Sequence, residues 1–171
     1  MSHESRIKIV IVGEPASGKT SVSQKYTMNS FSDNYSATIL MDFYAKDVDG
    51  MVLDIWDLSG HPEFFDDRGK LYSGSQVIIF VFDLTSRRTF DSLDMWLNEA
   101  NIWINKSENV VEKKPFFVLC GNKLDLATFR VVPTNEAEYW ARSRNIEYFE
   151  VSAFEGENLI KMFESCVNKF R

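Results

Sequence analysis

The sequence predicts an α/β fold: one domain over residues 1–171, with a six-stranded, mainly parallel sheet, one antiparallel edge strand and helices on both faces. Three observations predict it. Short β-branched and aromatic runs alternate with segments of helical periodicity, as in strands joined by crossover helices. Asp49 and Gly50 separate two apolar runs, which is a strong hairpin signal and implies one antiparallel strand. A length of 171 residues suits one domain with its own core.

The strands are expected at five apolar runs and in the first half of the hairpin. The runs cover 6–13, 50–58, 76–84, 114–122 and 146–153. Helices are expected over 18–29, 89–104, 134–144 and 157–169, and the polar segment 105–114 is expected to be a surface loop. In a doubly wound sheet of this kind, ligands bind at the carboxyl ends of the strands.

Composition excludes several classes of function. A net charge of −6 argues against nucleic-acid binding, and 44% apolar with 26% charged residues is typical of a soluble globular protein. Cys120 and Cys166 have no disulfide or zinc spacing, which favours a reducing compartment. No signal peptide, myristoylation glycine or prenylation cysteine is recognisable. We therefore expect a cytoplasmic monomer without a direct membrane anchor, which reaches a membrane or the nucleus only through partners.

The first expected strand runs into GEPASGKT at residues 13–20, which matches the phosphate-binding pattern G-x-x-x-x-G-K-[S/T] between a strand and a helix. Lys19 is expected to reach the outer phosphates and Thr20 to ligate Mg²⁺. A glycine-rich turn without a ligand is the structural alternative, but it leaves Lys19 without an evident partner. The expected phosphate-binding residues here are Glu14, Pro15, Ala16, Ser17, Gly18, Lys19, Thr20 and Ser21.

A phosphate loop alone leaves ATPases, kinases and GTPases open. GNKLD at 121–125 favours guanine, because Asp125 can accept from both N1–H and the exocyclic amine, a donor pair that adenine lacks. Alone, this motif is also an ordinary turn or helix cap. In VSAF at 151–154, the Ala153 N–H is expected to meet guanine O6. The expected guanine-binding residues of these two motifs are Asn122, Lys123, Asp125, Ser152, Ala153 and Phe154.

Three further residues are expected at the phosphates. Asp57 ends a strand and is expected to hold the Mg²⁺ hydration shell, while Gly60 is expected to offer its N–H to a terminal phosphate because no Cβ blocks the approach. Thr38 lies between the first helix and the hairpin, where its hydroxyl is expected to complete the magnesium shell when a γ-phosphate is present. The expected metal set is therefore Thr20, Thr38 and Asp57.

Five elements together resemble the Ras superfamily of small GTPases over essentially the whole chain, and within it the Rab branch. In their order along the sequence they are GEPASGKT, Thr38, Asp57 with Gly60, GNKLD and VSAF. The resemblance implies GTP or GDP and Mg²⁺ as ligands, and protein effectors or regulators that bind the switch segments. It implies that Phe31 flanks the guanine and Tyr35 covers the phosphates, and it gives catalytic roles to Lys19, Gly60 and the residue at position 61. It also suggests that Phe43, Trp56 and Tyr72 form an aromatic surface for partners, although all three are equally well explained as core between hairpin and switch.

Departures from the family pattern concentrate near the phosphates. His61 replaces a Gln whose amide contacts γ-phosphate and water at once, whereas a neutral imidazole has its donor and acceptor on opposite sides of the ring. Pro62 further restricts His61 to extended backbone angles. Slow hydrolysis is therefore expected. The other departures are Pro15, Leu40 for a Gly, Ser59 for an Ala, and Phe154 for a Lys.

GHPEFF, SLDMWLNEA and EAEYWARSRNIEYFEVSA are similar to an atypical Rab-like subgroup, called RJL, some of whose members carry a C-terminal J domain. Two hypotheses follow. The first is a Rab-like switch that cycles between GTP and GDP with weak hydrolysis. The second is a non-hydrolysing scaffold that holds GTP and presents its switch surface, and Pro15, Ser59 and His61 favour it. A small-molecule kinase is a third reading, which leaves NKLD unexplained and lacks an Arg-rich lid segment.

Overall fold

A computed structural model of the chain describes residues 5–106 and 113–171. Within these residues, six strands form one sheet in the order β2-β3-β1-β4-β5-β6, with β2 antiparallel to β3 and the other neighbours parallel. The predicted fold class is therefore confirmed. The strands are β1 (Ser5–Val12), β2 (Met41–Val48), β3 (Met51–Leu58), β4 (Val77–Asp83), β5 (Phe116–Asn122) and β6 (Glu147–Glu150).

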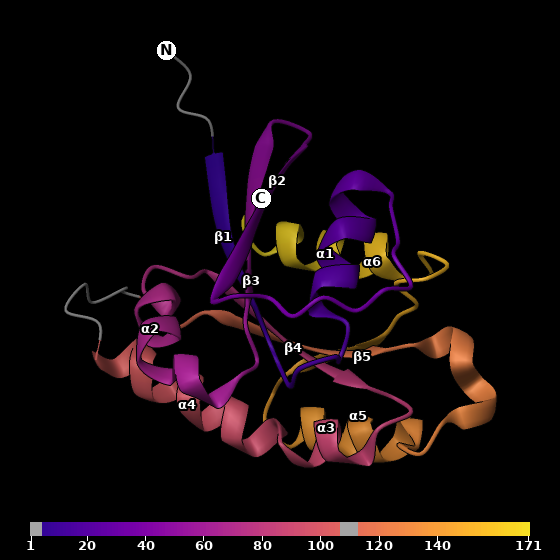
Figure 1. Cartoon of the computed structure of the whole chain (residues 1–171). Coiled ribbons are helices and arrows are strands. Elements are labelled where there is room, and N and C mark those ends of the chain that lie inside the picture. The colour runs from indigo at the N-terminus through magenta and orange to yellow at the C-terminus, as the bar shows by residue number, and fades with distance from the viewer. Residues whose placement is uncertain (1–4, 107–112) are drawn as a thin grey trace.

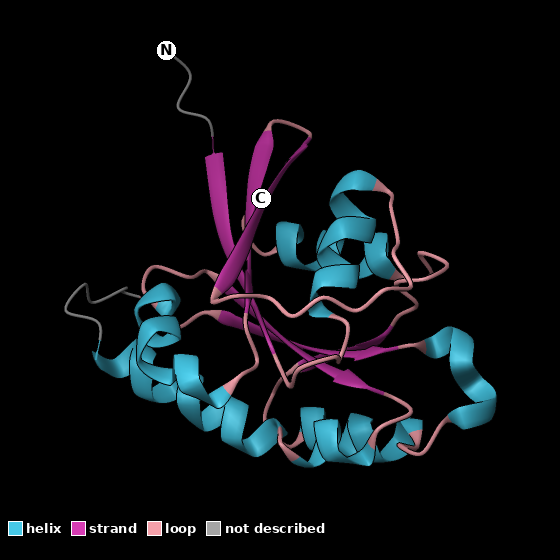
Figure 2. Cartoon of the chain, in the orientation of Figure 1, coloured by secondary structure: helices cyan, strands magenta, loops and turns pink. Residues whose placement is uncertain are grey.

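The helices lie on both faces of the sheet (Figures 1 and 2). On one face lie α1 (Lys19–Met28) and α6 (Leu159–Asn168). On the other lie α2 (Phe65–Gly69), α3 (Arg87–Asp91), α4 (Leu93–Lys106) and α5 (Thr134–Arg142). Short 3₁₀ turns are η1 (Pro62–Phe64), η2 (Lys70–Tyr72) and η3 (Leu124–Phe129).

The hairpin between β2 and β3 forms where Asp49 and Gly50 predict it. Both residues have positive φ, 53° and 82°, so the two-residue connection has the backbone of the tight turn that suits the twist of paired strands. Val48 pairs with Met51 directly across it. The hairpin places β2 at the edge of the sheet, beside the loop that joins it to α1.

Some boundaries differ from the sequence prediction. The helix expected over 89–104 is divided at Ser92, whose hydroxyl donates to the Thr89 carbonyl (2.9 Å), so that α3 and α4 are separate. The prediction of a surface loop over 105–114 is wrong for its first two residues, because α4 extends to Lys106. Most of that loop lies outside the described residues, as do residues 1–4. The short helical turns over 62–72 and 124–129 were not predicted.

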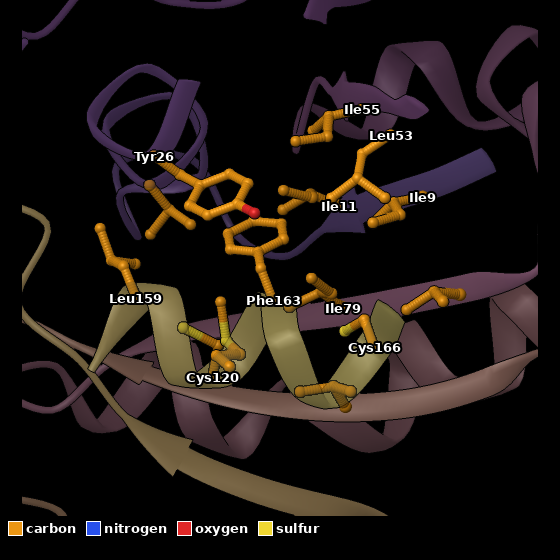
Figure 3. Close-up of a cluster of buried hydrophobic side chains, with 14 of the residues drawn as sticks. Ile9, Ile11, Tyr26, Leu53, Ile55, Ile79, Cys120, Leu159, Phe163 and Cys166 are labelled. Carbon is orange, nitrogen blue, oxygen red and sulfur yellow. The ribbon is translucent and has the colours of Figure 1, made fainter. Parts of the chain in front are cut away.

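The core is divided by the sheet into two buried clusters. Figure 3 shows the cluster under α1 and α6, in which Tyr26 stacks on Phe163 with ring centroids 3.8 Å apart. Burial raises the pKa of the Cys120 and Cys166 thiols, so both pack as neutral apolar groups. Across the described ranges, no helix is long and apolar enough to cross a membrane.

Candidate functional site

A cavity of about 600 Å³ opens at the carboxyl ends of the strands, where the sequence predicts ligand binding. Five segments far apart in the sequence line it: the β1–α1 turn, the loop from α1 to β2, the start of the β3–α2 loop, the loop after β5 and the loop after β6. The lining residues include Pro15, Ala16, Gly18, Lys19, Thr20, Ser21, Phe31, Tyr35, Thr38, Ser59, Gly60, His61, Asn122, Lys123, Asp125, Ala153 and Phe154.

The β1–α1 turn is shaped to bind an anion. Ala16 and Gly18 have positive φ, 63° and 99°, between residues of other conformations, and such alternation forms a concavity of backbone N–H groups. α1 begins directly after Gly18 without a side-chain cap, so its first-turn N–H groups are not satisfied by a capping side chain. A helix start of this kind favours phosphate. Glu14 contributes its backbone to the turn, while its side chain points away toward α4, where Trp96 Nε1 donates to it.

Lys19 places a buried ammonium group in the same turn. The side chain is 5% exposed, and its Nζ donates to the Glu14 carbonyl (2.9 Å). Desolvation lowers the pKa of Lys19 to about 8, against the opposing effects of Asp57 and Glu14. An anionic ligand would further stabilise the charged form of this side chain, which suits a phosphate-binding role.

Thr20, Thr38 and Asp57, the predicted metal set, converge at one point. The two threonine hydroxyls are 3.0 Å apart, and the Thr20 hydroxyl donates to Asp57 Oδ2. Asp57 is fully buried, and its Oδ1 has no hydrogen-bond partner in the described part of the chain. Desolvation raises the pKa of Asp57 to about 6 even though the Thr20 hydrogen bond and Lys19 lower it. Because magnesium prefers oxygen ligands, these residues fit the predicted ion.

Gly60 lies directly against the phosphate-binding turn. A Cβ at this position would stand 2.4 Å from the Gly13 carbonyl oxygen and 2.6 Å from the Pro15 nitrogen, so only glycine fits without displacing backbone. Ser59 is buried, and its N–H donates to the Leu40 carbonyl (2.7 Å). His61 follows at the cavity wall with φ −74° and ψ 135°, the extended conformation that Pro62 predicts.

The loops after β5 and β6 are tied to the phosphate-binding turn. Asn122 Nδ2 donates to the Ser17 carbonyl (3.2 Å), and Lys123 Nζ donates to the Ala16 carbonyl (3.2 Å). Asn122 Oδ1 accepts the Ala153 N–H (3.1 Å). That N–H, which is expected to meet guanine O6, lies at the cavity beside Asn122.

Asp125 and two phenylalanines line the same end of the cavity. The Ser152 hydroxyl donates to Asp125 Oδ1 (2.8 Å), which leaves the second carboxylate oxygen for another donor. Phe31 and Phe154 meet edge to face with centroids 5.2 Å apart, although they come from opposite ends of the chain. The cavity therefore has a polar, anion-binding end and an aromatic end with one carboxylate.

Sequence reasoning missed Asp83 at the end of β4. This buried carboxylate pairs with Lys123 Nζ (2.6 Å) and accepts the Thr85 N–H (2.7 Å). It therefore holds Lys123, which follows Asn122, in place. The available signal was its place at the end of an apolar strand, which is the same signal that identified Asp57.

The three residues of the expected aromatic surface, Phe43, Trp56 and Tyr72, differ in their exposure. Phe43 is 46% exposed and meets Trp56 edge to face with centroids 5.0 Å apart. Tyr72 is 1% exposed, and its hydroxyl donates to the buried Glu99 (2.9 Å), so the prediction that Tyr72 lies on a surface for partners is wrong for this structure. Its aromatic ring instead fills core beneath α4.

Comparison with known proteins agrees with this geometry. The profile of the Ras family matches residues 8–171. The chain is 37% identical over 94% of its length to DnaJ homolog subfamily C member 27 of Danio rerio and 33% identical over 94% to the human protein of that name. It is 41% identical over 92% of its length to Ras-related protein Rab-7a of Paramecium octaurelia, of which it covers 77%.

The chain spans 59% of the length of the DnaJ homologs that it matches, so those proteins are considerably longer. The Rab-7a and DnaJ-homolog relatives confirm the resemblance to Rab-like proteins and to the J-domain-associated subgroup. Members of this family are small GTPases that act as molecular switches. The chain therefore belongs to the Ras family, among its Rab-like members.

Proposed function

We propose that this chain is a Rab-like switch that cycles between GTP-bound and GDP-bound states with slow intrinsic hydrolysis. One observation carries the proposal: a single cavity joins an anion-binding turn, three converging oxygen-bearing side chains and a carboxylate beside two aromatic rings. Phosphates, a magnesium ion and a guanine base are the three chemical parts of one ligand that match these three features.

In this proposal the backbone of 14–21 binds the phosphates and Lys19 neutralises the outer ones. Thr20, Thr38 and Asp57 would hold Mg²⁺, which offsets charge on the phosphate oxygens when bound. Thr38 comes from the exposed loop before β2, whereas Thr20 and Asp57 belong to α1 and β3. A contact that only the triphosphate completes would therefore order that loop in one nucleotide state.

The guanine assignment rests on Asp125. Asp125→Asn replaces a carboxylate with an amide that retains one acceptor, so one charge-assisted hydrogen bond to the base is lost. GTP affinity should fall by about 10- to 150-fold, and xanthine nucleotide should gain affinity. Titration of both nucleotides measures this, and unchanged GTP binding would contradict the assignment. Glu138→Gln, an exposed change on α5 that removes the same charge, serves as the control.

A non-hydrolysing scaffold that holds GTP is the second candidate. The structural observation that favours it is the set of family departures at the cavity wall, where Pro15, Ser59 and His61 all line the phosphate end. Single-turnover measurement with the bound nucleotide identified distinguishes the two functions. Slow appearance of GDP supports the switch, and no GDP over a day supports the scaffold.

The partners proposed for either function are protein effectors and regulators that contact the switch segments. Phe43, which is exposed on the edge strand, and the partly buried Trp56 beside it on the next strand supply an aromatic pair for such contacts. The nucleotide released on denaturing the purified protein is the direct test of the whole proposal. Guanine nucleotide in near-stoichiometric amount supports it, whereas adenine nucleotide would refute it.

A further inference from the structure

A buried polar cluster lies outside the cavity, between α2 and α4. Arg68 and Glu99 are 2% and 4% exposed and form a two-point ion pair, with Nε to Oε1 at 2.7 Å and Nη2 to Oε2 at 2.8 Å. The Tyr72 hydroxyl donates to the same carboxylate (2.9 Å). Because Nε and Nη2 both bind Glu99, the ion pair fixes the orientation of the guanidinium and therefore the direction in which the third nitrogen, Nη1, points.

That third nitrogen holds the backbone on both sides of Gly60. Arg68 Nη1 donates to the Ser59 carbonyl (2.8 Å) and to the His61 carbonyl (2.9 Å). The Ser59 carbonyl belongs to the same peptide group as the Gly60 N–H. In a planar trans peptide the C=O and the N–H point in opposite directions, so holding this carbonyl toward Arg68 directs the Gly60 N–H away from it.

The second face of the cluster contacts the phosphate-binding turn. The Arg68 guanidinium lies over the Trp96 ring, 4.7 Å from its centroid, and Trp96 Nε1 donates to Glu14 Oε1 (3.2 Å). Trp96 and Glu99 are three residues apart on α4 and so share one face of that helix. The helix α4 thus contacts the phosphate-binding turn through Glu14 and the Gly60 segment through Arg68. Figure 1 shows α2, which carries Arg68, beside α4.

We propose that Arg68, held by Glu99, is a positioning residue that sets the Gly60 N–H for recognition of a terminal phosphate. This inference rests on the proposed function, since it assigns the device by which the switch distinguishes GTP from GDP. Arg68 does not touch the nucleotide; it acts through the Ser59 and His61 carbonyls. Because GDP lacks the γ-phosphate, loss of this positioning should affect GTP and leave GDP binding largely intact.

The test compares Arg68→Met with Arg130→Met in the full chain. Arg130 forms a two-point pair with Glu150 that is less buried and remote from Gly60, so Arg130→Met controls for breaking an ion pair without touching the Ser59 carbonyl. Affinities for GDP and for a non-hydrolysable GTP analogue are measured for each protein. We expect Arg68→Met to lower the affinity for the GTP analogue by about tenfold or more relative to GDP. Arg130→Met should change both affinities by the same factor.

Two further variants keep the test decisive if Arg68→Met does not fold. Arg68→Lys retains a donor for a carbonyl but cannot also bind Glu99 at two points, so it should give an intermediate ratio. Glu99→Gln removes the charge that directs the guanidinium, and a smaller loss of the same kind is expected. An unchanged ratio in every folded variant would overturn the inference alone. A wild-type chain that binds no guanine nucleotide would instead overturn the proposed function, and this inference with it.

Discussion

At the scale of single residues, His61 is the departure with the clearest chemical consequence. Its backbone is extended, its carbonyl accepts both the Phe64 N–H (3.2 Å) and Arg68 Nη1 (2.9 Å), and its side chain stands at the cavity wall. The backbone is thus fixed, and only the side chain is free to adjust. An imidazole in that place cannot contact a γ-phosphate and an attacking water together as a Gln amide does.

We expect His61→Gln to raise the intrinsic hydrolysis rate above a wild-type rate at or below about 10⁻⁴ per second. Single-turnover assays measure this rate. His61→Asn is the matched control, because it carries the same amide one methylene too short. An unchanged hydrolysis rate in His61→Gln would show that His61 takes no part in hydrolysis.

Gly60 provides a second prediction at this scale. Gly60→Ala would place a methyl group 2.4 Å from the Gly13 carbonyl oxygen, so the Ser59–His61 segment must move away from the phosphate-binding turn. The affinity for a GTP analogue should fall by about tenfold or more, while GDP affinity changes little. Gly74→Ala is the control, since its added methyl meets open space and costs only the strain of φ +71°, about 1 kcal/mol. Equal losses for both nucleotides in Gly60→Ala would argue against a phosphate-sensing role.

At the scale of elements, the segment between α1 and β2 is held at few points. Tyr35 and Ile39 are 63% and 82% exposed. The contacts toward the cavity include the Thr38 hydroxyl on Thr20, the Leu40 carbonyl on the Ser59 N–H, and Phe31 on Phe154. Leu40 also has φ +59°, a left-handed conformation that costs a non-glycine residue about 1–2 kcal/mol. A segment with so few anchors depends on the ligand for its order.

Limited proteolysis should therefore cleave residues 32–42 faster in the GDP state than with a GTP analogue and Mg²⁺. Leu40→Gly removes the backbone strain but adds freedom to the chain, so it should speed cleavage in the GDP state more than in the GTP state. The hairpin turn at Asp49 and Gly50 serves as the internal reference, because neither nucleotide contacts it. Equal protection of 32–42 in both states would count against any switch.

At the scale of the whole molecule, the cavity brings together segments that are far apart in the sequence. The cavity is lined by the turn after β1, the loop before β2 and the loops after β3, β5 and β6. Its buried groups also carry a cost in the free protein, since Asp57 holds an unpartnered oxygen and Lys19 a desolvated cation. A ligand that satisfies these groups binds the folded state alone and stabilises it.

Magnesium and nucleotide should therefore stabilise the fold together. At a hundredfold excess over its dissociation constant, GDP with Mg²⁺ should add about 2.7 kcal/mol, which raises the melting temperature by roughly 5–10 °C for a domain of this size. Chelation of Mg²⁺ should remove part of that gain and speed nucleotide release. Calorimetry with and without chelator measures it, and Asp57→Asn should reduce the magnesium-dependent share. A melting temperature indifferent to both ligands would contradict the proposed site.

Most of the fold could be predicted because its signals are local. Apolar runs, helical periodicity and the Asp49–Gly50 turn each act within a few residues, and the strands and hairpin formed where they indicated. The candidate residues around 13–20, Asp57 and 121–125 could be found for a related reason: each follows a strand, and parallel strands bring their carboxyl ends to one edge. Their shared position is thus a consequence of the strand pattern.

What only the tertiary structure decided lies where distant segments meet. That Tyr72 is core and not surface depends on Glu99, and the role of Arg68 depends on which carbonyls come within reach of its third nitrogen. The engagement of the Ala153 N–H by Asn122 likewise needs β5 and β6 side by side. Sequence patterns report propensity and burial along the chain, whereas a buried charge is compensated by whatever partner the fold brings within about 3 Å. The sequence alone therefore determined the family and the edge of the sheet at which the ligand is expected to bind. Tertiary packing determined how the residues at that edge are held in place.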